Sequence, residues 1–115
     1  MALEVPFEVR CESQGEILLA QVIGEADVIN AAKLETLCMP FPGQPPRKMI
    51  VDLTQLTFIS SLAMGKLIAA RKSVRKHGGT VILAAPSPLV NEALRRARLH
   101  DIFPIASSVD EAREL

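Results

Sequence analysis

The chain of 115 residues contains no tryptophan and no tyrosine, and its formal net charge at neutral pH is zero. A platform for stacking nucleic-acid bases would have only four phenylalanines to draw on. Nucleic-acid-binding domains also carry a basic excess, which this composition lacks. We therefore expect no nucleic-acid partner. Because 49% of the residues are apolar, the composition also excludes a disordered tail.

Cysteine and histidine are scarce as well. Cys11 and Cys38 do not form a C-x-x-C pair, and neither His77 nor His100 has a second ligand close by in the sequence. We expect reduced cysteines, no metal site and no cofactor. The chain has no Gly-x-Ser-x-Gly motif and no Gly-x-x-x-x-Gly-Lys loop. The sequence thus predicts a protein that is not an enzyme and has no catalytic residue.

Long apolar segments are absent too. No apolar run approaches the roughly 18 residues that span a bilayer, and the opening residues "MALEVPFEVR" lack the basic and apolar regions of a signal peptide. We expect a cytoplasmic protein without direct membrane insertion. The length suits one domain over residues 1–115.

The first third of the chain predicts two antiparallel strands and a helix. Apolar and polar residues alternate over residues 6–13, Gly15 marks a turn, and residues 16–24 are mostly apolar. Asp27 then stands at the position of a helix N-cap. The residues after it that fall on one helical face are Val28, Ala31, Leu34 and either Leu37 or Cys38.

A proline-rich loop over residues 39–48 separates this helix from a second strand-and-helix unit. The run "KMIVDL" from Lys48 is typical of a central strand that is covered on both faces. A connector then leads to a helix over about residues 62–77, which ends at Gly78-Gly79.

The last third repeats the alternation of strand and helix. The run "TVILAA" over residues 80–85 predicts another buried strand. Ser87 followed by Pro88 predicts the start of a helix, and Ser108 with Glu111 has the spacing of a capping box before a short C-terminal helix. The sequence predicts an α/β fold with a mixed sheet of about four strands and helices packed on it.

Two adjacent hydroxyls, Ser60 and Ser61, fall between the central strand and the second helix. Ligand groups gather at the carboxyl ends of strands in such sheets, and the N-terminus of a helix attracts anions. A hydroxyl at this place either caps the helix or accepts a phosphate. Asp27 precedes the first helix, and Asp52 ends the central strand. For both residues we expect structural roles in capping a helix or stabilising a turn.

The second helix carries an apolar stripe suited to the core, formed by Ala63, Leu67, Ala70 and Val74. Met64 and Ile68 lie beside the stripe, near Arg71, and either widen the core or form a contact surface. Gly65 costs this helix about 1 kcal/mol relative to alanine, which hints at close approach by a neighbouring backbone or by a partner.

These motifs together resemble the STAS domain, the sulfate transporter and anti-sigma factor antagonist family, over nearly the full chain. "GEAD" at residues 24–27 resembles the family's G-E-L-D, and "VDLTQLTFISS" at residues 51–61 resembles its D-L-S-x-V-x-F-[IM]-D-S-[ST]-G-L-G segment. Residues 75–105 resemble its G-G-x-[LV]-x-[LV] strand, Pro-led helix and closing I-F-P-I. Where the family most often has Asp, then Ser or Thr, then Gly around the acceptor, this chain has Ser60, Leu62 and Ala63.

The resemblance implies a non-enzymatic anti-sigma factor antagonist that regulates transcription by partner switching. In that family an anti-sigma factor that is a serine kinase phosphorylates a serine at the start of the second helix, and a serine phosphatase removes the phosphate. The acceptor falls on Ser61. The expected partner-binding residues are Asp27, Ser60, Ser61, Leu62, Met64, Ile68 and Arg71.

Two other functions stay open. Some stand-alone STAS-like proteins are cytoplasmic accessory subunits of lipid-transport ABC complexes, and a small molecule or nucleotide could bind beside Ser61. A neighbouring gene for a serine kinase or phosphatase would favour switching, whereas genes for a permease and an ATPase would favour transport. The sequence leaves the oligomeric state open.

Overall fold

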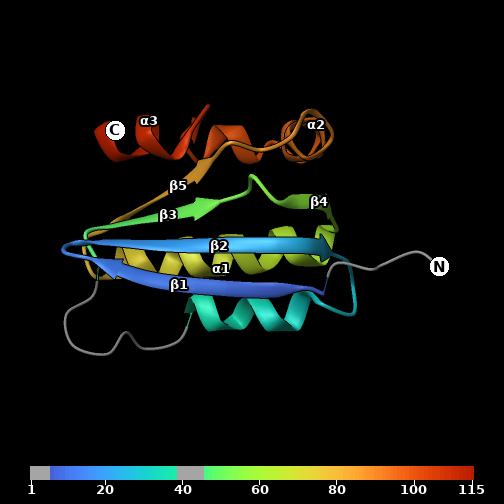
Figure 1. The fold of residues 1–115 in the computed structure, drawn as a ribbon, viewed down its shortest axis with the longest axis horizontal. Helices are drawn as coiled ribbons and strands as arrows, with labels where there is room; N and C mark the ends of the chain where they lie inside the picture. Colours follow the sequence, from blue (N-terminus) through green and yellow to red (C-terminus); the bar gives the residue numbers. More distant parts are fainter. Residues whose placement is uncertain (1–5, 39–45) are drawn as a thin grey trace.

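A mixed sheet of six strands forms the centre of the molecule (Figure 1). The computed structural model describes residues 6–38 and 46–115. Among the strands of this part of the chain the order is β1-β2-β3-β5-β6, with β4 paired to the far end of β2, and only β1 runs antiparallel to its neighbour. The strands are β1 (Glu8–Gln14), β2 (Ile17–Ala26), β3 (Lys48–Asp52), β4 (Leu56–Ile59), β5 (Thr80–Ala84) and β6 (Ile105–Ala106).

The predicted α/β fold with a mixed sheet is confirmed. The four expected strands are β1, β2, β3 and β5, and the structure adds the short strands β4 and β6. The residues expected to connect the central strand to the second helix contain β4, which pairs in parallel with the last residues of β2. The proline-rich loop expected over residues 39–48 lies mostly outside the described residues.

Helices cover both faces of the sheet (Figure 1). They are the α-helices α1 (Ser61–Lys76), α2 (Pro88–Arg96) and α3 (Val109–Glu114), and the 3-10 helices η1 (Ala31–Cys38) and η2 (Leu99–Asp101). The larger core cluster joins α1, η1 and α2 to one face of the sheet, and a smaller cluster joins α3 to the other. Successive side chains of β3 point to opposite faces of the sheet and so contribute to both clusters. Met49 and Val51 belong to the larger cluster and Ile50 to the smaller one.

Gly79 allows β5 to begin directly beneath the end of α1. A Cβ atom at this position would lie 2.6 Å from the carbonyl oxygen of Pro46 and 2.7 Å from Cγ1 of Val74. These distances are far shorter than ordinary van der Waals contact, so only glycine fits without a shift of the backbone.

The segment after β2 differs from the predicted helix. The carboxylate of Asp27 accepts a hydrogen bond from the backbone N–H of Asn30 at 2.8 Å, and the chain makes a turn before η1 begins at Ala31. Val28 therefore lies outside the helix and is 66% exposed, so the prediction that it shares one helical face with Ala31 and Leu34 is wrong. The other members of the predicted stripe, Ala31, Leu34 and Leu37, are buried as expected.

The two C-terminal helices begin at the predicted serines. Ser87 Oγ accepts a hydrogen bond from Val90 N at 3.3 Å, and Ser108 Oγ accepts one from Glu111 N at 3.0 Å. The capping box is only half formed, because the Glu111 carboxylate bonds Ser107 instead of the backbone of Ser108. The hydrogen bonds from Ser107 hold the pKa of Glu111 below its usual value.

Candidate functional site

Ser60 is the N-cap of α1. Its Oγ accepts a hydrogen bond from Ala63 N at 3.2 Å, and its carbonyl oxygen accepts one from Met64 N at 3.0 Å. Its own N–H donates to the carbonyl of Ala26 at 2.8 Å, which ties the start of α1 to the end of β2. The Ser60 side chain is buried, so its hydroxyl has a structural task.

The variant Ser60→Ala is expected to lower the free energy of unfolding by about 1 kcal/mol, because it removes this cap. Chemical denaturation of wild-type protein and the variant measures the difference. The neighbouring substitution Ser61→Ala is the matched control and should stay within about 0.5 kcal/mol of wild type. An equal effect of the two substitutions would mean that Ser60 does not cap the helix in solution.

Ser61 is the first residue of α1, and its side chain is exposed. Within residues 6–38 and 46–115 its hydroxyl makes no hydrogen bond, so it is accessible to modification. The N–H groups of Ala63 and Met64 are already bonded to Ser60, whereas that of Leu62 is left for an anion. The first turn of α1 contains no acidic residue, so the helix dipole there favours a negative charge.

The backbone of Asp27 lies close to that of the two serines. Asp27 follows Ala26, whose carbonyl receives the N–H of Ser60, and Ala26 pairs with Ile59 in the sheet. Its carboxylate accepts a hydrogen bond from Asn30 N, which stabilises the turn over residues 28–30, and the helix expected to begin directly after Asp27 begins only at Ala31. Asp52 also has its default turn role, because its Oδ1 accepts hydrogen bonds from the backbone N–H and the hydroxyl of Thr54.

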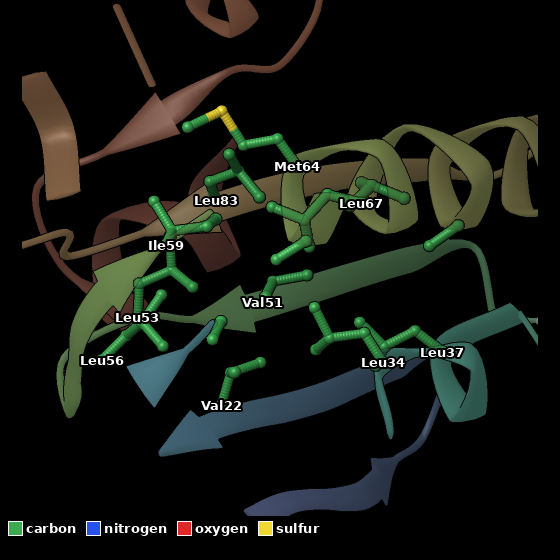
Figure 2. Packing of buried hydrophobic residues seen from close by; sticks show 14 of the residues in the cluster. Val22, Leu34, Leu37, Val51, Leu53, Leu56, Ile59, Met64, Leu67 and Leu83 are labelled. Atoms are coloured by element: carbon green, nitrogen blue, oxygen red, sulfur yellow. The ribbon is translucent and has the colours of Figure 1, made fainter. Parts of the chain in front are cut away.

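Met64 and Ile68 have different environments. Met64 is only 8% exposed and belongs to the larger core cluster, where Figure 2 shows it with Ile59, Leu67 and Leu83. Ile68 is 41% exposed, one turn further along α1. Of the two predicted contact residues, Ile68 is the one with apolar surface to offer, and Leu62 at 49% exposure is another.

Arg71 lies apart from the serines. It is ten residues beyond Ser61, roughly 15 Å along the helix axis. Its Nε donates a hydrogen bond to the carbonyl oxygen of Ile102 at 2.9 Å, which connects α1 to the end of η2. The structure therefore gives Arg71 a structural bond and does not place it beside Ser61.

Sequence reasoning missed three exposed apolar residues at this end of the molecule. Val28 and Ile29 follow the end of β2 and are 66% and 85% exposed, and Phe58 on β4 is 45% exposed. Their segments are tied to the start of α1 by the Ser60–Ala26 bond and the pairing of β4 with β2. The signal for the first two was the adjacent pair of β-branched residues directly after Asp27, because neighbouring positions on a helix point in different directions.

Other chemistry is sparse in the described part of the chain. Within residues 6–38 and 46–115 no group of three His, Cys, Asp or Glu side chains could hold a metal ion. None of the helices that the structure describes is long and apolar enough to cross a membrane. Cys11 is a free, exposed cysteine on β1, and desolvation by its neighbours raises the pKa of its thiol above the usual value.

Comparison with known proteins relates this arrangement to one family. A protein of Bordetella bronchiseptica named as an anti-sigma factor antagonist, BtrV, is 28% identical over 96 residues, which cover 84% of this chain and 83% of that protein. The structure of an anti-sigma factor antagonist from Mycobacterium paratuberculosis has a TM-score of 0.84 at 23% identity, with 97% of each chain covered.

The Bacillus cell fate determinant SpoIIAA in its phosphorylated form has a TM-score of 0.64 at 21% identity, covering 95% of this chain and 97% of SpoIIAA. At these low identities the two solved structures establish the fold alone. The family model of the STAS domain matches residues 8–112, almost the whole length. The chain therefore belongs to the STAS domain family.

Proposed function

We propose that this protein is an anti-sigma factor antagonist that works by partner switching, with Ser61 as its phosphorylation switch. The unmodified protein binds an anti-sigma factor that is also a serine kinase, and a serine phosphatase reverses the modification. The protein acts in the cytoplasm as a binding module and not as an enzyme. Membership of the STAS family and the similarity to BtrV support this role.

The observation that carries the proposal is that the two adjacent serines have different environments. Ser60 is buried and caps α1, whereas Ser61 is exposed at the first helical position. Phosphorylation of Ser61 therefore leaves the cap intact. The phosphate would lie at the helix N-terminus, where the dipole and the N–H of Leu62 favour negative charge.

The surface around Ser61 has the composition of a protein interface. The exposed apolar residues on α1 and on the segments bonded to its start, called the Ser61 surface from here on, are Val28, Ile29, Phe58, Leu62 and Ile68. Exposed apolar groups of this kind supply most of the energy of protein–protein binding when a partner covers them. A phosphate among them would have to be desolvated by that partner, so modification and binding compete.

Gly65 supports a closely packed partner on this surface. It lies one turn after Ser61 and is exposed, and a Cβ atom built on it meets nothing within 4 Å. No neighbouring backbone within the described residues explains the glycine, so of the two reasons considered for it, approach by a partner remains. We infer that the partner's backbone passes over Gly65.

The variant Gly65→Ala separates stability from binding. We expect the free energy of unfolding to rise by up to about 1 kcal/mol, because alanine is the better helix former and has open space here. We expect the affinity for the partner to fall about tenfold, because the methyl group would keep the partner's backbone at a distance. Denaturation and calorimetry measure the two effects. A gain in stability with unchanged affinity would mean that the partner does not pack over Gly65.

A pull-down from the source cell identifies the partner that these experiments need. Wild-type protein should capture a serine kinase, and phosphopeptide mapping should place the phosphate on Ser61 in a fraction of the molecules. Ile68→Asp is the matched bait, because it alters the Ser61 surface at an exposed position. Capture of the same kinase by wild type and Ile68→Asp alike would contradict the proposed binding surface. A permease and an ATPase as the captured proteins would contradict the proposed function.

A further inference from the structure

β1 is an edge strand with one free side. It is the first strand in the sheet order, and within residues 6–38 and 46–115 it pairs only with β2. Its middle residues, 10–13, are exposed. An exposed edge of this kind is a template for pairing with another strand, and the side chains on it determine which strand fits.

The hydrogen bonds of β2 show which residues of β1 face outward. Glu16, the residue before β2, accepts a hydrogen bond from the N–H of Lys48 in β3. Gly24 of β2 donates a hydrogen bond to the carbonyl of Gln55, just before β4. The even-numbered residues of β2 therefore direct their peptide groups to the parallel strands. The odd-numbered residues then face β1, where their partners are even-numbered, as in the pair Arg10 and Gln21. The free edge of β1 thus presents the N–H and C=O groups of Val9, Cys11 and Ser13.

This geometry restricts how β1 can pair with a second copy of itself. In an antiparallel pair, a residue whose N–H and C=O groups face the partner strand lies opposite another such residue. In β1 these are the odd-numbered residues, so odd-numbered residues must lie opposite odd-numbered ones. This holds only if the two-fold axis passes through a residue of the strand and not between two residues. Centred on Cys11, all seven residues of β1 are paired. Arg10 then lies opposite Glu12 of the second copy, and this contact occurs twice.

The neighbouring registers are less favourable. Centring the pair on Arg10 places two arginine side chains opposite each other, and centring it on Glu12 does the same with two glutamates; like charges at directly opposed positions are destabilising. Centring it on Val9 brings Glu8 opposite Arg10 but pairs only residues 8–10, and residues 11–14 have no partner in β1 of the second copy. The charge pattern of β1 therefore selects the register centred on Cys11.

We propose that β1 forms a homodimer by antiparallel edge-to-edge pairing with a second copy of this chain, in the register centred on Cys11. The two Arg10–Glu12 contacts fall at non-hydrogen-bonded pairs, where opposed side chains are closest. Arg10 already bonds Glu8 through Nε at 2.8 Å and through a terminal nitrogen at 3.0 Å, and its remaining donors are available for the second carboxylate. The contact area is small, so the dimer is weak. This inference rests on β1 alone and is independent of the proposed function.

Charge reversal with rescue tests the dimer. Sedimentation equilibrium of the full chain from about 10 µM to about 1 mM should show a monomer–dimer equilibrium for the wild type, as expected for a small interface. Arg10→Glu and Glu12→Arg should each weaken dimerisation by about tenfold or more, because attractive pairs become repulsive. The double variant should return to within about threefold of wild type, because the pairs are restored with reversed signs.

Arg95→Glu on the exposed side of α2 changes the net charge as Arg10→Glu does and should leave dimerisation unchanged. A short thiol-to-thiol cross-linker should join Cys11 to Cys11, as peptide mapping of the cross-linked dimer would show. A wild type that sediments as a monomer throughout would overturn the proposal. So would a double variant as weak as the single ones, or a dimer without the Cys11–Cys11 link.

Discussion

The variant Ser61→Asp is expected to bind the captured partner at least about a hundredfold more weakly than wild type, because an uncompensated charge buried at an interface costs several kcal/mol. Phosphoserine carries about −1.5 to −2 charges and should weaken binding further. The fold should survive, because Ser61 is exposed and the start of α1 favours negative charge. Isothermal titration calorimetry with the purified partner measures the affinities.

Ser61→Ala is the matched control for this experiment. It keeps the surface apolar and uncharged, so it should bind the partner as wild type does and no longer respond to the kinase. Ser60→Ala should also keep its affinity, although its stability is lower. Equal affinities of Ser61→Asp and Ser61→Ala, with Ser61 unmodified in stressed and unstressed cells, would leave a binding module without a serine switch.

Ile68→Asp is expected to weaken partner binding by about a hundredfold or more while the protein still melts cooperatively. Ile68 is 41% exposed on α1, so a charge there is solvated in the free protein and buried only by the partner. Met64→Asp should instead lose the fold, because Met64 is 8% exposed and an unpaired buried charge costs a large part of the roughly 5–15 kcal/mol that holds a domain together. Thermal melting followed by calorimetry measures both effects.

The contrast between these two residues makes the test specific. Normal binding by Ile68→Asp would show that the exposed side of α1 is not the contact face. Loss of the fold in Ile68→Asp would show that its side chain is needed in the core. A Met64→Asp variant as stable as wild type would contradict the buried position of Met64 in Figure 2.

The order of the main elements was predictable because each carries a local signal. The alternation in residues 6–13, the apolar run "KMIVDL" and the caps at Ser87 and Ser108 depend only on neighbouring residues. The strand β4 was not predictable, because it lacks the alternation that marks a strand. Its four residues are buried, exposed, exposed and buried in turn. A register shift between Gly24 and Glu25 of β2 accompanies this irregular pairing.

The site could be predicted in position but not in detail. The sequence placed both serines at the start of a helix, but which one caps it depends on where the first turn begins, and capping signals do not resolve one residue. Met64 and Ile68 flank the same core stripe, so only the packing of α1 against β5 and its neighbours decides which is buried. Val28 was assigned to a helix face because its segment was read with a regular period, whereas Asp27 stabilises a turn there.

The affinity of the purified partner for this protein, before and after stoichiometric phosphorylation of Ser61, tests the switch most directly. We expect the unmodified form to bind, the phosphorylated form to show no binding at the same concentrations, and phosphatase treatment to restore the original affinity. Equal affinities of the two forms would contradict a role for Ser61 in partner switching.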